Sequence, residues 1–317
     1  MRAFDFGAGQ VAVTVHHDRS SHLTRFFADA TEEVDGGDVD LLLHVVAGGV
    51  ARLELDQNTR TATLVVPRAK LADESAATQV QIAVLQAAAR CLDCVLPSDH
   101  LLLHGSASEL GDGGRAVAVL DGGHGQGKTS LAFGLACAGG RLLVDEFTFL
   151  RFDQGGNVVF PAARLPWHIR GDMAPHLVPD RPDSRLLFPG ELRGCVGCVD
   201  AAAELMAVLI PDGRRPAGSV TRVDMFAEVE CYLRPALTDH RAKLLDPRLD
   251  HVSLFAGPDQ ITSVGGASMA HLGFRWEQRC SEALHAMREV PLFLVGIGTP
   301  ADIGVSVQAA RLALESL

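Results

Sequence analysis

Residues 122–129 read Gly122-Gly123-His124-Gly125-Gln126-Gly127-Lys128-Thr129, which is the pattern G-x-x-x-x-G-K-T. The glycines of such a turn let backbone N–H groups point inward around a polyphosphate. The lysine reaches the terminal phosphates, and the threonine hydroxyl can ligate Mg²⁺. The pattern therefore predicts a phosphate-binding loop, a P-loop, with Ser130 following directly as the next contact for the phosphates.

The flanking sequence supports this prediction. Residues 116–120 form a continuous apolar run, as expected of a buried parallel strand. Residues 130–138 favour a helix, which Gly139 and Gly140 would end. The phosphates would then lie at a helix N-terminus, where the dipole and unpaired N–H groups favour an anion. A glycine-rich turn that binds nothing is the alternative, and the agreement of strand, loop and helix disfavours it.

An acidic pair follows the loop at short range. Residues 142–144 favour a strand that ends at Asp145 and Glu146, seventeen residues after Lys128, which leaves room for one helix and one strand. We expect the pair at the carboxyl end of a neighbouring strand, where a Mg²⁺ ligand or a catalytic base is needed. The alternative is a carboxylate pair that faces solvent.

A histidine precedes the loop. His104 follows the apolar residues 101–103 and stands directly before Gly105. A lone histidine is more often structural than catalytic, and residue chemistry alone leaves both interpretations open.

Composition narrows the function classes. The chain has 317 residues, which is enough for one large domain or two smaller ones. Its net charge of −11 argues against nucleic acid or an anionic membrane as a partner. The first residues lack the apolar core of a signal peptide, and no apolar stretch reaches the roughly 20 residues of a membrane span. We therefore expect a cytoplasmic protein.

Seven scattered cysteines predict reduced thiols rather than a disulfide framework. Two C-x-x-C pairs, Cys91/Cys94 and Cys195/Cys198, could together supply four zinc ligands. About a hundred residues separate the pairs, and the first lies in an apolar, helix-like stretch. Zinc ribbons hold their pairs much closer together, so the sequence disfavours a zinc site.

The fold class is predicted to be α/β, with a β-rich region over residues 1–95 and a P-loop domain over residues 96–317. In the first region, strands at 11–15, 41–46, 50–55 and 61–66 suggest antiparallel hairpins, and residues 78–95 favour a connecting helix. The second region is expected to contain further strands and helices, namely strands at 158–160, 205–211 and 291–295 and helices at 227–233, 239–245 and 301–314.

These motifs together resemble a known family. His104-Gly105, the P-loop, and residues 140–146 (Gly-Arg-Leu-Leu-Val-Asp-Glu) are similar to the core of HPr serine kinase/phosphorylase. The likeness is greater to the HPr kinase-related group, which includes the lasso peptide kinases. It covers about residues 100–150 and extends more weakly to residues 160–166, which contain Arg164.

The resemblance implies a core like that of phosphoenolpyruvate carboxykinase and phosphoryl transfer from ATP, or another phosphate donor, to a hydroxyl, usually a serine. By position, Asp145 and Glu146 would hold Mg²⁺ together with Thr129 and accept the hydroxyl proton. His104 would tune the acidic pair, Lys128 would neutralise the transferred group, and Arg164 would contact phosphate or substrate. The acceptor would be a peptide, a protein or a small hydroxylated molecule, and self-association is also implied.

Two departures from the family limit the comparison. HPr kinase has two aspartates where this chain has Asp145-Glu146, and the glycine-rich signature that follows them and supports phosphorylase activity is missing. We therefore expect neither HPr as the substrate nor the reverse reaction. Two other functions stay open: a nucleotide-hydrolysing switch, and a nucleotide-binding module that recognises a peptide at a sheet edge without transfer chemistry.

Overall fold

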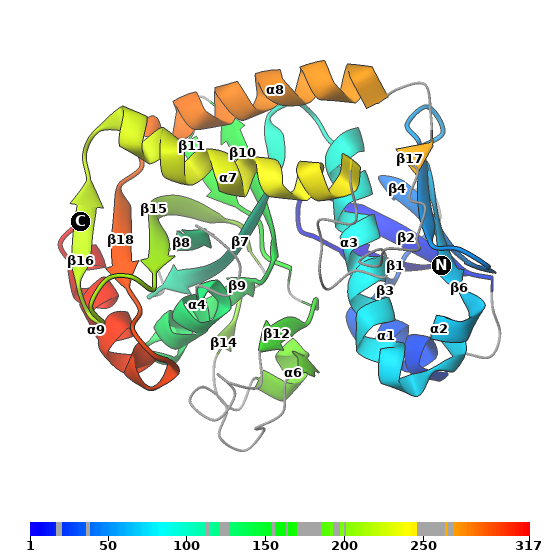
Figure 1. The fold of residues 1–317 in the computed structure, drawn as a ribbon, viewed down its shortest axis with the longest axis horizontal. Helices are drawn as coiled ribbons and strands as arrows, with labels where there is room; N and C mark the ends of the chain where they lie inside the picture. The colour runs from blue at the N-terminus through cyan, green and yellow to red at the C-terminus, as the bar shows by residue number, and fades with distance from the viewer. Residues whose placement is uncertain are drawn as a thin grey trace.

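The computed structural model describes residues 1–16, 21–35, 39–111, 114–120, 127–153, 156–162, 164–169, 185–192, 197–199, 201–245, 264–265 and 269–317. These residues form a mixed α/β structure in which two large mixed sheets lie on either side of helix α3, Ala77–Val95 (Figure 1). The α/β class predicted from the sequence is confirmed at this level.

The N-terminal sheet has the strand order β17-β5-β6-β4-β2-β1-β3. The strands are β1 (Arg2–Asp5), β2 (Gln10–Val15), β3 (Glu32–Glu33), β4 (Leu41–Gly48), β5 (Arg52–Asp56), β6 (Thr61–Pro67) and β17 (Val264–Gly265). Both β5–β6 and β1–β2 are antiparallel, as a hairpin requires. However, β2–β4 and β4–β6 are parallel, so the prediction of hairpins throughout is wrong.

The parallel pairing of β2 with β4 depends on a helix that was not predicted from the sequence. Helix α1 (Ser21–Ala30) connects β2 to β4, and a crossover of this kind is what a parallel pair requires. Its buried residues Leu23, Phe26 and Phe27 recur at helical spacing, and Phe4 of β1 packs against both phenylalanines. A short helix, α2 (Arg68–Ala72), follows β6.

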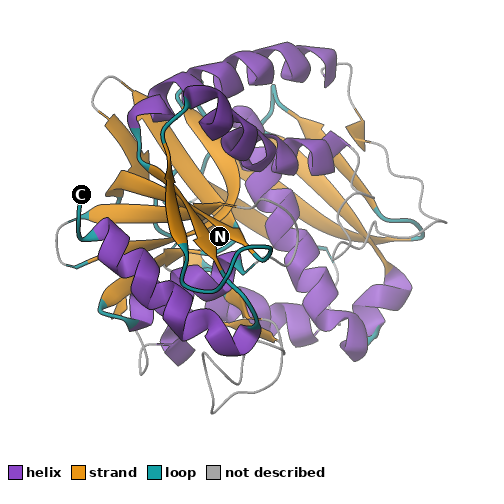
Figure 2. Ribbon diagram, turned by 60° about the vertical axis from the view of Figure 1, so that its left-hand side comes forward, coloured by secondary structure: helices purple, strands orange, loops and turns teal. Residues whose placement is uncertain are grey.

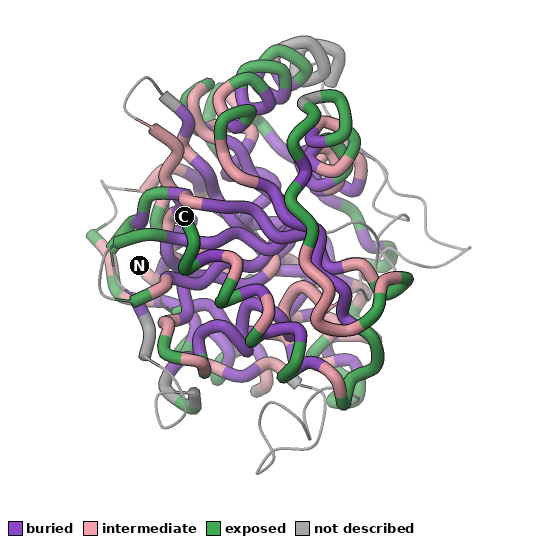
Figure 3. Tube along the Cα trace, turned by 90° about the vertical axis from the view of Figure 1, so that its left-hand side faces the viewer, coloured by how far each residue is buried: buried purple, intermediate pink, exposed green. Residues whose placement is uncertain are grey.

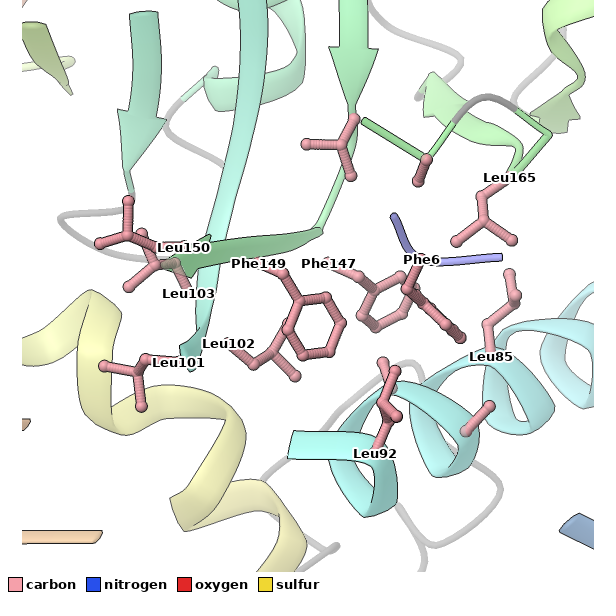
Figure 4. Packing of buried hydrophobic residues seen from close by; sticks show 14 of the residues in the cluster. Phe6, Leu85, Leu92, Leu101, Leu102, Leu103, Phe147, Phe149, Leu150 and Leu165 are labelled. Atoms are coloured by element: carbon pink, nitrogen blue, oxygen red, sulfur yellow. The ribbon is translucent and has the colours of Figure 1, made fainter. Parts of the chain in front are cut away.

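Helix α3 is buried around almost its whole circumference from Val80 to Asp93. Most of these buried residues are apolar, which places the helix inside a core, and α3 contacts both sheets, through β2, β4 and β6 on one side and β7 on the other. Phe6, directly after β1, packs against Phe147 and Phe149 of the second sheet, with ring centroids 6.4 and 5.7 Å apart (Figure 4). The two sheets therefore share one apolar core.

The second sheet has the order β14-β9-β7-β10-β11-β15-β18-β16, and β8 pairs with both β7 and β15. The strands are β7 (His100–Leu110), β8 (Arg115–Leu120), β9 (Gly140–Val144), β10 (Phe147–Asp153), β11 (Gly156–Val159), β14 (Gly197–Cys198), β15 (Ala203–Asp212), β16 (Val220–Val223) and β18 (Leu292–Gly296). Strands β7, β10, β11, β15 and β8 thus form a closed circuit of pairings.

Strands β9 and β10 follow one line along β7. Val144 pairs with Ala107 and Phe147 with His104, so Asp145 and Glu146 are a two-residue interruption of a single long strand. The sequence predicted the acidic pair on a neighbour of the strand before the P-loop. In the structure, β7 lies between β8 and β9, so the acidic pair is one strand farther from β8 than predicted.

Helices cover both faces of the second sheet (Figures 1 and 2). Helices α4 (Lys128–Cys137) and α9 (Ile303–Leu314) pack on one face, where Val117 and Val119 of β8 point. Helices α7 (Phe226–Leu245) and α8 (Met269–Ala286) lie across the other, where Ala116 and Ala118 join the main core. Figure 3 shows buried strands between these partly exposed helices.

Helix α7 replaces the two helices predicted at 227–233 and 239–245. Pro235 lies inside it, yet the helix continues because Leu233, Ala236 and Leu237 are all buried against the core. The remaining described elements are a small sheet of β12 (Trp167–Ile169) and β13 (Arg185–Leu187), and the short helix α6 (Pro189–Leu192).

Candidate functional site

The end of the predicted P-loop lies at the start of α4. Gly122, Gly123, His124, Gly125 and Gln126 lie outside the described residues; β8 ends at Leu120 and α4 begins at Lys128. Gly127 precedes the helix with φ +89°, a left-handed conformation that favours glycine. Its carbonyl oxygen accepts from the N–H of Leu131, 2.8 Å away. Strand, glycine, lysine and helix therefore follow in the order that the motif predicts.

Asp145 is the most connected polar group near this helix start. It is 4% exposed, and its Oδ1 accepts from the hydroxyls of Ser106, at 2.6 Å, and Thr129, at 2.8 Å. The other oxygen, Oδ2, accepts from the backbone N–H of His168 at 2.9 Å. The contact with Thr129 joins the last residue of the motif to the first residue of the acidic pair, as the sequence spacing suggested.

The surroundings of Asp145 act on its ionisation in opposite directions. Burial raises the pKa of Asp145, and the neighbouring Glu146 carboxylate raises it further, whereas the donors Ser106, His168 and Thr129 lower it. The balance leaves the pKa above its ordinary value. A cation at this position would favour the charged form, because opposite charge stabilises a carboxylate.

Glu146 has an unusual backbone conformation. Its φ is +64°, a left-handed value that L residues other than glycine rarely adopt. The imidazole Nε2 of His240, on α7, lies 3.0 Å from the Glu146 carbonyl oxygen. Arg90 Nε lies 3.5 Å from the opposite ring nitrogen, Nδ1, as a donor, so His240 carries its proton on Nε2 and donates it to Glu146. Phe147 stacks on the same imidazole, 5.6 Å between ring centroids.

His104 meets a carboxylate from the same helix. Its Nδ1 lies 2.7 Å from Oδ2 of Asp239, and Lys243 Nζ lies 2.8 Å from the same oxygen. The His104 ring also lies beside that of His240, with centroids 5.2 Å apart. His104 and Lys243 are both buried, 5% and 4% exposed. A carboxylate held against one ring nitrogen fixes the orientation of an imidazole, so Asp239 is a positioning residue for His104.

These contacts set the charges around the histidines. Burial opposes ionisation of Asp239, but the hydrogen bond from His104 and the neighbouring basic side chains outweigh it and hold the pKa of Asp239 well below its usual range. Burial, with the nearby His104 and Arg90, holds the pKa of His240 well below its usual range. Near neutral pH, Asp239 is therefore an anion and His240 is neutral.

The structure thus brings together Thr129, Asp145, Glu146 and His104, with Lys128 opening the same helix as Thr129. Ser130 is buried in α4. Arg164 is not joined to this group by any hydrogen bond or ion pair within the described residues. Its half-exposed guanidinium lies 3.7 Å from Oε2 of Glu32, at the edge of the N-terminal sheet.

Sequence reasoning missed several contributors, namely Ser106, Asp239, His240, Lys243, Arg90 and the backbone of His168. Ser106 could have been predicted from the sequence, since it stands two residues after His104 on the same strand and therefore on the same face. Asp239 and Lys243 have the four-residue spacing of a helical ion pair. Nothing local links them to residue 104, because α7 is more than a hundred residues further along the chain.

The oxygen donors suit Mg²⁺ better than a softer metal. Thr129 Oγ1 and Asp145 Oδ1 are hard oxygens 2.8 Å apart at a helix N-terminus, and Mg²⁺ in phosphate sites takes one or two such ligands together with phosphate and water. Within the described part of the chain, no three His, Cys, Asp or Glu side chains gather into a metal-binding group. Of the two C-x-x-C pairs, Cys91 and Cys94 lie in α3, Cys195 lies outside the described residues, and the backbone of Cys198 is in β14.

The sequence matches no model of a known protein family, and no curated protein matches it. None of the helices in the described residues is long and apolar enough to cross a membrane.

Proposed function

We propose that this chain is a Mg·ATP-dependent kinase that transfers a phosphoryl group to a hydroxyl, on a peptide or protein serine or on a small hydroxylated molecule. The observation that carries the proposal is the 2.8 Å hydrogen bond between the Thr129 hydroxyl and the buried carboxylate of Asp145. In P-loop phosphotransferases, a hydroxyl directly after the lysine and an aspartate at a strand end share the metal. The core would be of the phosphoenolpyruvate carboxykinase and HPr kinase kind.

The nucleotide phosphates are assigned to the helix start. Lys128 and the N–H groups of the first turn of α4 supply positive charge there, in keeping with the motif at residues 122–129. When bound, Mg²⁺ would neutralise charge that develops on the phosphates. Thr129 and Asp145 are the residues that would hold it.

The two acids take different roles. Both oxygens of Asp145 already accept hydrogen bonds, from Ser106, Thr129 and His168. Glu146 stands next to it, half-buried, in a turn that His240 holds through the backbone. We assign Asp145 to metal binding and Glu146 to accepting the proton of the acceptor hydroxyl, since a base needs a carboxylate oxygen that is open to the substrate.

The His104 imidazole completes the site from β7. Asp239 orients its ring, and Lys243 keeps Asp239 ionised. His104 therefore acts on the electrostatics beside the acidic turn. Most of the rate enhancement would come from charge and position rather than covalent chemistry.

The test is transfer of labelled phosphate from Mg·ATP to a panel of acceptors, read by mass spectrometry as the gain of one phosphoryl group. The panel should contain serine peptides, proteins and small alcohols. We expect Lys128→Ala to abolish transfer and Lys70→Ala, on α2, to leave it unchanged. Equal transfer by the Lys128→Ala protein would overturn the proposal. Release of free phosphate in place of transfer would favour the switch, and nucleotide binding without turnover would favour the recognition module.

A further inference from the structure

Two histidines face each other at the end of strand β2 in the N-terminal sheet. His16 directly follows β2, and His44 lies on the neighbouring parallel strand β4 (Figure 1). Nε2 of His16 lies 3.0 Å from Nδ1 of His44, and the ring centroids are 5.1 Å apart. The pair belongs to neither the P-loop nor the acidic turn.

The sheet holds the backbone of both histidines in place. His44 pairs with Thr14 in the register of β2 and β4, and the N–H of His16 donates to the carbonyl oxygen of Val45, 2.9 Å away. His16 stands two residues after Thr14, so its side chain lies on the same face of the sheet as that of His44. The spacing of the two imidazoles is therefore set by the parallel pairing of their strands.

The two imidazoles are accessible and have no competing partner. His16 is exposed and His44 is partly exposed, and neither ring has an ion pair or another hydrogen bond among the described residues. The histidines of the candidate site differ, because Asp239 takes Nδ1 of His104 and both ring nitrogens of His240 are bonded. The facing nitrogens of His16 and His44 are therefore available to a cation from solution.

The distance between the facing nitrogens fits a shared metal ion. Imidazole nitrogens bind zinc at about 2.0–2.1 Å, so two of them at an angle of about 90–110° lie about 2.9–3.4 Å apart. The observed separation of 3.0 Å falls within this range. Imidazole suits Zn²⁺, Ni²⁺ and Cu²⁺, whereas Mg²⁺ prefers oxygen ligands, so the pair would select a different cation from the phosphate site.

We propose that His16 and His44 together bind one divalent cation of the Zn²⁺, Ni²⁺ and Cu²⁺ class, with water in the remaining positions. In the metal-free protein, one ring donates its N–H to the lone pair of the other. On binding, that ring takes its proton on the other nitrogen by exchange with solvent, so both facing nitrogens offer lone pairs. Two coordinate bonds then replace one hydrogen bond, both rings stay neutral, and the metal keeps its charge.

Calorimetric titration of the full chain with ZnCl₂, NiCl₂ or CuCl₂, without a histidine tag and in excess Mg²⁺, tests this site. The Mg²⁺ occupies the oxygen ligands at Asp145. The exposed Cys137 and Cys231 are first blocked with iodoacetamide, because thiolates also bind these ions. We expect one ion per chain with a Kd in the micromolar range. No binding of any of the three ions would overturn the proposal.

Matched variants assign the ion to the pair. His16→Gln and His44→Gln should each weaken binding by about tenfold or more, since either exchange leaves a single imidazole. His285→Gln removes an exposed histidine of α8 and should leave binding unchanged. Weakening by only one of the first two exchanges, or equal weakening by His285→Gln, would contradict a shared site. Lys128→Ala should bind the ion as the unaltered chain does, so failure of the kinase proposal would not affect this result.

NMR of the unaltered chain identifies the ligating atoms without any substitution. In isotope-labelled protein with blocked thiols, saturating Zn²⁺ should shift the resonances of His16 Nε2 and His44 Nδ1. The ring nitrogens of His285 should keep their positions. If neither facing nitrogen shifts, the two histidines form only a hydrogen bond between strands, and the proposal is wrong.

Discussion

The Nε2 of His240 lies 3.0 Å from the carbonyl oxygen of Glu146, which joins two residues 94 positions apart in the sequence. The contact ties helix α7 to the turn that interrupts strands β9 and β10. It also holds Glu146 by its backbone, so the carboxylate of the same residue stays available for chemistry.

Exchange of each acid for its amide should separate the two assigned roles. We expect Glu146→Gln to lower the rate of transfer by about 10²–10⁴-fold, the usual effect of removing a general base, with little change in nucleotide affinity. Asp145→Asn should instead weaken nucleotide binding in the presence of Mg²⁺ and leave binding without Mg²⁺ nearly unchanged. Calorimetry and initial rates measure the two effects. The reverse pattern would exchange the roles of the two acids.

The backbone of Glu146 predicts a conflict between stability and activity. A left-handed conformation costs an L residue about 1–2 kcal/mol, and glycine adopts it freely. Glu146→Gly should raise the free energy of unfolding by up to about 1 kcal/mol and abolish transfer.

Arg60 provides the matched control for Glu146→Gly. It lies in the turn between β5 and β6 and has φ +50°. Arg60→Gly should give a similar stability gain with full activity. Urea denaturation of both variants tests the pair, and a loss of stability in Glu146→Gly would refute the strain argument.

The ion pair on α7 should matter more than an exposed pair on the same helix. Asp239→Asn leaves the Lys243 charge buried without its partner, and we expect a loss of about 3 kcal/mol in the free energy of unfolding. Glu230→Gln breaks the more exposed pair with Arg234 and should cost less than about 1 kcal/mol. Adding Lys243→Met to Asp239→Asn should recover part of the loss. Equal costs for the two single variants would contradict the burial argument.

Close packing of α4 on α9 depends on Gly134. A Cβ added there would lie 2.4 Å from Cγ2 of Val307, so one of the two helices has to move. Gly134→Ala should destabilise the fold by about 1–3 kcal/mol. Val307→Ala should relieve the clash, so the double variant should be more stable than the sum of the two single effects predicts. Strictly additive effects would show that the helices do not meet at this point.

The thiols should differ sharply in reactivity, because the thiolate is the reactive form. Burial raises the pKa of Cys91 to about 12, that of Cys280 to about 11, and that of Cys94 well above its ordinary value. Cys137 and Cys231 are exposed. At mildly alkaline pH, iodoacetamide should label Cys137 and Cys231 and spare the other three, as peptide mass spectrometry would show. All seven cysteines of the chain should react after denaturation, and rapid native labelling of Cys91 would contradict the described packing of α3.

The sequence predicted those parts of the fold whose signals are local. The runs at 41–46, 61–66 and 205–211 are strands, and the 78–95 stretch is a helix, because apolar periodicity reports burial directly. The parallel pairing of β2 with β4 could not be predicted from apolar periodicity. It depends on α1, which is short and has Arg25 and Asp29 among its apolar residues.

The candidate site shows the same limit. The Thr129–Asp145 contact could be anticipated, because one helix and one strand fix its distance along the chain. The supports from α7 could not, since Asp239 and His240 reach residues 104 and 146 only through the packing of α7 on β7. Arg164 differs from these residues, because its motif predicted a contact with phosphate or substrate, whereas the structure places it beside Glu32 at the N-terminal sheet.

Strand β10 pairs with β7 in the same register as β9 does, on the far side of the acidic turn. This shared register restricts the substitutions and insertions that the turn can accept. Phe147 and Phe149 enter the core against Phe6 because two residues, an even number, separate β9 from β10. One residue more or fewer would turn every side chain of β10 to the opposite face and expose both rings. Exchange of Asp145 or Glu146 can therefore alter the chemistry of the turn without disturbing the core, whereas insertion or deletion of a single residue cannot.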